Sequence, residues 1–168
     1  MVGKFAKPSG TEVSTEIRDE RLLRLYLYWM ERKGARRLPS RGDVDPLDFR
    51  YLLGNIMLLD VLGQPPRFRV RLHGSNMVMR AGYDLTGKFL DDLPIPEYRN
   101  YVIERCRGLV KTGMPLVVQH DRVLGGQPQR YEALWLPFSS DGTQVTMLLC
   151  ALIYMGDRAW SPHEPPAA

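Results

Sequence analysis

Residues 55–72 have the sequence NIMLLDVLGQPPRFRVRL, which carries the clearest secondary-structure pattern in the chain. Residues 55–62 are almost wholly apolar, with Asp60 as the one acid, and this pattern is typical of a buried strand. Residues 63–66 contain one Gly and two Pro and indicate a turn. In residues 67–72 arginines alternate with apolar side chains, which is typical of a strand with one buried and one exposed face. The stretch therefore predicts an antiparallel β-hairpin.

Three more strands are predicted in the second half of the chain, at residues 116–123, 130–138 and 144–154. Gly125-Gly126 links the first two of them and Asp141-Gly142 links the last two, and both dipeptides are typical of hairpin turns. The long connection between the two strand groups lets them join edge to edge in one sheet. We therefore expect an α+β fold with a five-stranded antiparallel sheet and helices packed on one face.

Four helices are predicted around these strands, over residues 14–33, 45–54, 75–82 and 97–111. The first has Ser14 or Thr15 as its N-cap, and Gly34 ends it. Its apolar face is broad and partly aromatic, and consists of Leu22, Leu25, Tyr26, Trp29 and Met30, with Leu23 at its margin. Such a face has to be buried, either against the rest of the domain or against a second chain.

The composition is that of one globular domain, since 44% of the 168 residues are hydrophobic and 25% are charged. The longest apolar run, residues 147–155, is far shorter than the about 20 residues of a membrane-spanning helix. The N-terminal residues lack the apolar core of a signal peptide, and two cysteines are too few for a disulfide scaffold, so we expect a cytoplasmic protein. The expected division is a tail and helix over residues 1–34, a core domain over residues 35–155 and a flexible tail over residues 156–168.

The formal charge of +4 is concentrated after the first predicted helix, in a basic segment that contains no acid: Arg32, Lys33, Arg36, Arg37 and Arg41. Such a cluster can contact the phosphates of a nucleic acid. It is also typical of an exposed linker at the C-terminal end of a helix, where the helix dipole favours cations. No zinc-finger, helix-turn-helix or RNP-type pattern accompanies it. We therefore interpret the segment as a linker, and nucleic-acid binding through residues 32–41 is the alternative.

Four short stretches, in this order, resemble the PAS domain family: LPSRGDVDP at residues 38–46, RVRLHGS at 69–75, GYDLTGK at 82–88 and LPFSSDG at 136–142. The resemblance extends over residues 20–155 and is narrower still to the short stand-alone bacterial PAS proteins. It implies the strand order 2-1-5-4-3 and a non-catalytic sensory or protein-interaction module. Such a module often forms homodimers through a helix that flanks the core, and it reports to a separate signalling protein.

The resemblance also bears on cofactors. Flavin-binding members of the superfamily carry a cysteine in a motif on the central helix, whereas the corresponding residues 75–80 read SNMVMR here and contain none. Haem-binding members use an axial histidine, and the long helix over residues 97–111 contains no histidine. We therefore expect neither covalent flavin nor haem, and the residues indicate no other cofactor.

Arg105 is the most informative residue of the predicted site. It lies in the middle of the apolar stripe of the helix over residues 97–111, where a charge is unfavourable unless it has a partner. In a PAS arrangement this helix faces the sheet across a pocket. We therefore predict that Arg105 holds an anionic or carbonyl-bearing ligand. The two alternatives are an internal ion pair with Asp60 and a guanidinium that extends from the helix edge into solvent.

Other predicted pocket residues gather where the second strand ends and the next helix begins. His73 lies at that junction, and the expected pocket also includes Asn76, Met77, Tyr83 and Tyr101. The three histidines of the chain are too far apart in sequence for a metal site of the HxxxH kind. A small enzyme that uses the same pocket is the alternative function, although no local pattern indicates a catalytic nucleophile.

The fourth predicted strand has apolar side chains on both of its faces. We assign Leu134 and Leu136 to the face under the helices, which places Tyr131 and Trp135 on the outer face of the sheet. An apolar outer face of this kind needs a cover, and the apolar face of the first helix is the expected one. We predict a homodimer built on this helix and the outer sheet face.

Overall fold

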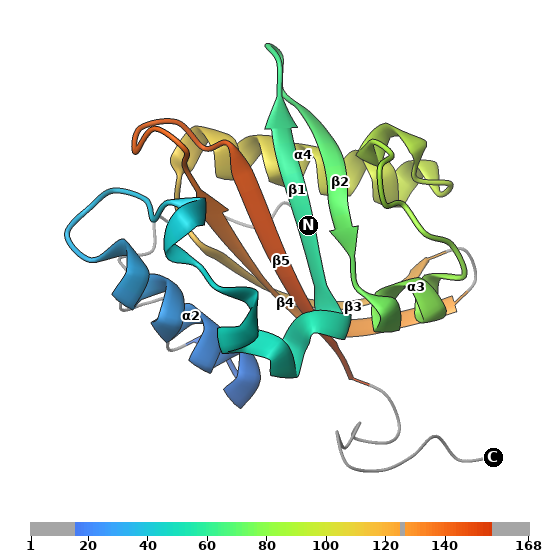
Figure 1. Cartoon of the computed structure of the whole chain (residues 1–168). Coiled ribbons are helices and arrows are strands. Elements are labelled where there is room, and N and C mark those ends of the chain that lie inside the picture. Colours follow the sequence, from blue (N-terminus) through green and yellow to red (C-terminus); the bar gives the residue numbers. More distant parts are fainter. Residues whose placement is uncertain (1–15, 125–126, 156–168) are drawn as a thin grey trace.

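The computed structural model describes residues 16–124 and 127–155 of the chain. Within these residues, five strands form one antiparallel sheet in the order β2-β1-β5-β4-β3 (Figure 1). The strands are β1 (Ile56–Leu62), β2 (Arg67–His73), β3 (Leu116–Leu124), β4 (Gln127–Phe138) and β5 (Met147–Tyr154). This order and pairing confirm the predicted α+β fold, while the predicted Gly125-Gly126 turn lies outside the described residues.

The described helices precede the sheet or lie within the connection that joins its two strand groups. They are α2 (Glu20–Lys33), α3 (Ser75–Ala81) and α4 (Pro96–Thr112), with the 3-10 helices η1 (Arg41–Asp43), η2 (Pro46–Asn55) and η3 (Leu90–Asp92). The helix predicted over residues 45–54 is thus a 3-10 helix, and α4 passes behind the strands in Figure 1. None of the helices in the described ranges has the length and apolar character needed to cross a bilayer.

The β1–β2 hairpin has the predicted alternation. Phe68 and Val70 are buried, whereas the arginines between and around them are exposed. Asp60 of β1 pairs with Arg69 in the strand register, and its carboxylate forms ion pairs with Arg69 at 3.2 Å and with Arg71 at 2.7 Å. The alternative in which Asp60 pairs with Arg105 is therefore wrong, because the partners of Asp60 are its cross-strand neighbours.

The helix predicted over residues 14–33 is interrupted within the described residues. Glu16 is helical, residues 17–19 are not, and α2 begins at Glu20 with Asp19 as its N-cap. The physical reason lies in β4: one carboxylate oxygen of Glu132 accepts hydrogen bonds from the backbone N–H groups of Arg18 and Asp19, at 2.9 and 3.0 Å. This contact anchors the chain just before the helix to the sheet, while the N-caps predicted at residues 14 and 15 lie outside the described residues.

The apolar face of α2 is buried against the sheet of its own chain. Four of its predicted side chains are buried and Met30 is partly buried; the four are Leu22, Leu25, Tyr26 and Trp29. The indole N–H of Trp29 donates a 2.9 Å hydrogen bond to the backbone carbonyl of Pro137 in β4. The helix therefore covers one face of the sheet within the single chain, and the homodimer through these side chains stays a prediction.

The two faces of β4 are the reverse of the prediction. Tyr131 and Trp135 lie on the face that looks toward α4, because they line a cavity together with residues of that helix. Since side chains alternate along a strand, Leu134 and Leu136 lie on the opposite face, beneath α2. The prediction failed because both faces of this part of β4 are buried, so polarity does not distinguish them.

Candidate functional site

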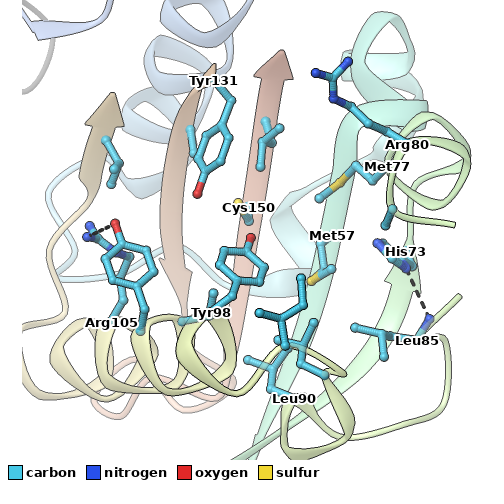
Figure 2. Close-up of a pocket in the computed structure, with 18 of the residues that line it drawn as sticks. Met57, His73, Met77, Arg80, Leu85, Leu90, Tyr98, Arg105, Tyr131 and Cys150 are labelled. Atoms are coloured by element: carbon cyan, nitrogen blue, oxygen red, sulfur yellow. Dashed lines mark hydrogen bonds between the residues drawn. The ribbon is translucent and has the colours of Figure 1, made fainter. Parts of the chain in front are cut away.

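A cavity of about 230 Å³ lies between the sheet and the helices α3 and α4 (Figure 2). β1, β4 and β5 supply one wall with Met57, Tyr131, Ala133, Trp135, Cys150, Leu152 and Tyr154. The helices supply the other with Met77, Arg80, Ala81, Tyr98, Tyr101, Val102 and Arg105. The long connection between β2 and β3, which contains α3 and α4, therefore encloses the cavity against the sheet.

Five of the six pocket residues predicted from the sequence line this cavity: His73, Met77, Tyr83, Tyr101 and Arg105. Asn76 does not. Its side-chain amide donates to the Oδ1 of Asn55 at 2.8 Å, and the amide of Asn55 donates to the backbone carbonyl of Leu152 at 2.9 Å. Asn76 therefore helps to attach α3 to the sheet, and the prediction that it lines the pocket is wrong.

Several lining residues were not predicted as pocket residues. The largest set comes from the sheet, where the predicted faces of β4 place Tyr131 and Trp135 away from the pocket, and α4 adds Tyr98. The usable signal was alternation: once one residue of a strand is known to face the cavity, the residues two positions away face it too. Figure 2 shows the Tyr98 and Tyr131 hydroxyls directed into the cavity from α4 and β4.

Arg105 is held at one side of the cavity by an aromatic partner. Its Nη2 donates a hydrogen bond to the hydroxyl of Tyr101, and the guanidinium lies 4.6 Å from the centre of the Tyr101 ring. Its Nε is buried and has no hydrogen-bond partner among the described residues. A buried donor without a partner lowers stability by about 1–3 kcal/mol, and by more when the group is charged. Arg105 thus retains an unmet capacity for an acceptor at the cavity wall.

The charges along the cavity wall are of one sign. Arg80 lies on the opposite side from Arg105 in Figure 2, with its guanidinium 4.3 Å from the centre of the Tyr154 ring. Among the described residues that line the cavity there is no Asp or Glu. The fixed charges facing the cavity therefore favour an acceptor-rich or anionic occupant.

His73 lies in the wall as a neutral imidazole. Its Nδ1 accepts a hydrogen bond from the backbone N–H of Leu85 at 3.2 Å (Figure 2), so the ring proton belongs on Nε2. Burial lowers the pKa of His73 below its ordinary value, and the carboxylate of Asp84, 3.7 Å from Nδ1, opposes this shift only in part. His73 therefore offers the site an N–H donor and no charge at neutral pH.

The depressed pKa of His73 predicts a loss of stability in mild acid. The unfolded chain takes up this proton near pH 6.5 and the folded chain only at lower pH. The contribution of His73 is therefore fully present above about pH 6.5 and is lost as the pH falls through the lower folded-state pKa. We expect the free energy of unfolding, measured by urea denaturation, to fall between pH 7.5 and pH 5.5.

The control for this prediction is His73→Asn. The asparagine side-chain oxygen can still accept a hydrogen bond from the N–H of Leu85, but asparagine does not titrate in this range. The free energy of unfolding of the variant should therefore depend less on pH. Carboxylates and other histidines contribute equally to both proteins. An unchanged slope between pH 7.5 and pH 5.5 in the variant would show that His73 is not the group responsible.

Three buried tyrosines and the one thiol of the cavity are neutral at neutral pH. Burial raises the pKa of the Tyr154 hydroxyl to about 12 and raises the pKa values of Tyr98 and Tyr131 as well. Burial likewise raises the pKa of the Cys150 thiol, which keeps it protonated, whereas a reactive cysteine needs a lowered pKa. The cavity therefore presents aromatic surface and hydrogen-bond donors.

Three arginines of the basic segment have partners within the chain. Arg36 forms an ion pair with Asp43 at 2.6 Å and Arg32 with Asp48 at 3.5 Å. Arg37 donates to the backbone carbonyl of Thr143 at 3.2 Å. These contacts are consistent with the interpretation of the segment as a linker that joins α2 to the core.

The size of the cavity and the position of its thiol bear on cofactor binding. Pockets for drug-sized ligands have volumes of about 300–1,000 Å³, and the cavity of about 230 Å³ is smaller than that range. Cys150, its one thiol, lies on β5 and not on the helix expected for a flavin adduct. In the part of the chain that the structure describes, no three His, Cys, Asp or Glu side chains are grouped to hold a metal ion.

Comparison with known proteins identifies the family. No curated protein matches the sequence. Among solved structures, the PAS domain of BvgS from Bordetella pertussis is similar with 17% identity over 68% of this chain and 90% of that one, at a TM-score of 0.49. The Rhodobacter sphaeroides LOV protein is similar with 16% identity over 68% of this chain and 70% of that one, at a TM-score of 0.47. A family model described as a PAS domain matches residues 17–153. Since that match spans most of the sequence, the chain belongs to the PAS domain family.

Proposed function

We propose that this PAS domain is a sensory module without catalytic activity, which binds a small molecule in the cavity and reports its presence to a separate protein. PAS domains are generally sensory, non-catalytic modules. The observation that carries the proposal for this chain is the buried Nε of Arg105, which lacks a hydrogen-bond partner among the described residues, in the wall of a cavity of about 230 Å³. A ligand with an acceptor oxygen would satisfy that donor.

The chemistry of the wall supports binding over catalysis. General acid–base catalysis needs a group whose pKa lies near the working pH, whereas the Cys150 and Tyr98 pKa values are raised and that of His73 is lowered, each mainly by burial. A small enzyme in the same cavity would have to work without a carboxylate among its described lining residues. Nucleic-acid binding has less support, because Arg32 and Arg36 of the basic segment are engaged by acids of the chain itself.

A route from the cavity to the outer surface runs through β4. Tyr131 lines the cavity, and the next residue, Glu132, accepts hydrogen bonds from the N–H groups of Arg18 and Asp19 just before α2. A ligand that shifts Tyr131 would therefore act on the attachment of α2. We also propose that the partner, or a second copy in a homodimer, binds this helix, and that the protein acts in the cytoplasm.

The proposal is tested by a thermal-shift screen of small metabolites on the wild-type protein, followed by native mass spectrometry of any hit. A ligand at about 100 times its Kd should stabilise the fold by about 2.7 kcal/mol. Arg105→Ala should lose this stabilisation. Arg107→Ala is the matched control, because Arg107 lies on the same helix and its side chain is exposed in a pair with Glu104. Equal retention of the hit by all three proteins would contradict a role for Arg105.

A further inference from the structure

We propose that the ligand is a small aromatic carboxylate, consisting of one ring and a short acid chain, whose carboxylate binds Arg105. This inference rests on the proposed function and adds the chemical class of the molecule sensed. It depends on three properties of the cavity: the charges that face it, the side chains that form its walls and its size.

The charges of the lining residues indicate an anion. Arg105 and Arg80 carry positive charge and His73 offers an N–H donor, while the described lining residues include no acid. The Arg105 guanidinium donates to the Tyr101 hydroxyl and its Nε has no acceptor among the described residues, so an oxygen of the ligand would satisfy this donor. A carboxylate oxygen on Nε forms a charge-assisted hydrogen bond, which is about twice as strong as a neutral one.

Arg105 is a better anchor than Arg80. The Nε of Arg105 is buried, whereas Arg80 is exposed to solvent, and an ion pair is weakened by screening when it is exposed. Tyr101 also fixes the orientation of the Arg105 guanidinium by a hydrogen bond and by stacking. The acid end of the ligand therefore belongs on the α4 side, and the ring extends from there toward the centre of the cavity.

The walls around that centre favour an aromatic ring. Tyr98, Tyr131 and Trp135 present aromatic surface from α4 and β4, and Met57 and Met77 add thioethers that adapt to the edge of a ring. An aliphatic chain would bury a similar apolar area but would make no ring–ring contacts, which add to the stabilisation from the buried area alone. The Tyr98 and Tyr131 hydroxyls point into the cavity (Figure 2), so these two side chains offer a ligand both aromatic surface and polar groups.

The size limits the ligand to about one ring and a short chain. An apolar protein cavity of about 150 Å³ holds benzene, and this cavity has about 230 Å³. The difference accommodates a carboxylate on two or three carbons, whereas a second fused ring with its own polar substituents would exceed it. 3-Phenylpropanoate has this composition and is a suitable probe.

The test is isothermal titration calorimetry of the full chain with three probes: 3-phenylpropanoate, its neutral amide and hexanoate. We expect 3-phenylpropanoate to bind at least about tenfold more tightly than either of the others. The amide keeps the ring and removes the charge, and hexanoate keeps the charge and removes the ring. Arg105→Gln should bring the affinity for the acid down to that for the amide, while Arg107→Gln on the exposed side of α4 should leave it unchanged.

The outcomes separate this inference from the proposed function. Equal affinity for acid and amide would overturn the anionic class, and equal affinity for hexanoate would overturn the aromatic class, yet in both cases the cavity binds a small molecule and the sensory proposal stands. If none of the three probes gives a heat of binding, the proposed ligand class is overturned. If the thermal-shift screen also finds no ligand, the proposed function is overturned as well. The comparison of probes uses the wild-type protein, so it does not depend on how well a variant folds.

Discussion

Replacing Trp29 with alanine is expected to lower the free energy of unfolding by about 3–5 kcal/mol, which is the usual effect of truncating a buried large aromatic side chain. Trp29 is 2% exposed and is stacked beside Tyr26, with 6.4 Å between the ring centres. The truncation removes this packing on the outer face of the sheet. It also removes the indole N–H that donates to the buried carbonyl of Pro137.

The matched control is Leu27→Ala. Leu27 lies on the same helix but is 56% exposed, so its truncation should change the free energy of unfolding by no more than about 0.5 kcal/mol. Both variants are measured by urea denaturation followed by far-UV circular dichroism, because tryptophan fluorescence would change with the substitution itself. A loss below about 1 kcal/mol for Trp29→Ala would show that α2 does not seal this face of the sheet.

The same experiment tests the proposed homodimer. If α2 covers the sheet of its own chain in a monomer, the unfolding midpoint of the wild type should not depend on protein concentration. If two chains exchange this helix, the midpoint should rise with concentration, because association stabilises only the folded state. The four buried side chains of α2 are compatible with either arrangement, so concentration dependence is the deciding measurement.

The elements that the sequence predicts well are those with a local signal. The β1–β2 hairpin follows from a turn rich in Gly and Pro and from the alternation that buries Phe68 and Val70. α4 ends at Gly113, whose φ of 63° is a conformation that glycine adopts readily. The start of α2 is not local in this sense, since Glu132 of β4 holds the residues that precede it. The sequence around residue 14 does not indicate this contact with Glu132.

The faces of β4 show why the site was only partly predicted. Residues 131–138 are all buried, so no exposed side chain identifies the outer face. Glu132 would ordinarily mark the solvent side, but here it is 1% exposed and accepts backbone N–H groups from the other end of the chain. The aromatic wall of the cavity, with Tyr131 and Trp135, therefore could not be assigned before the position of α2 was known.

Arg105 shows the opposite case. A charge in the middle of an apolar helical stripe is visible in the sequence, and the structure places it in the cavity wall. Its partner was not predictable, because Asp60 is engaged across the hairpin by Arg69 and Arg71, and the nearest aromatic on the same helix, Tyr101, takes its place. Contacts set by strand register depend on the pairing of whole strands and not on the type of the two residues.

Replacing Gly74 with alanine is expected to lower the free energy of unfolding by about 3 kcal/mol or more, at the upper end of the effect of inserting atoms into packed structure. A Cβ at this position would lie 2.4 Å from the carbonyl oxygen of Gly54, 2.6 Å from its carbonyl carbon and 2.9 Å from the backbone nitrogen of Ile56. These are backbone atoms, so no side-chain rotation can relieve the overlap. The N–H of Gly74 also donates to the carbonyl of Ile56 at 2.8 Å, which holds the two segments together.

The matched control is Gly108→Ala in α4, where an added Cβ would meet no atom within 4 Å. Alanine is favoured over glycine inside a helix by about 1 kcal/mol, so this variant should be more stable than the wild type. Urea denaturation of the two variants therefore gives changes of opposite sign. Because Gly74 follows His73 and precedes α3, Gly74→Ala should also displace Met77 and weaken ligand binding, while Gly108→Ala should leave binding intact. A Gly74→Ala protein with wild-type stability would contradict the close approach of these two backbones, and with it the position of this wall of the cavity.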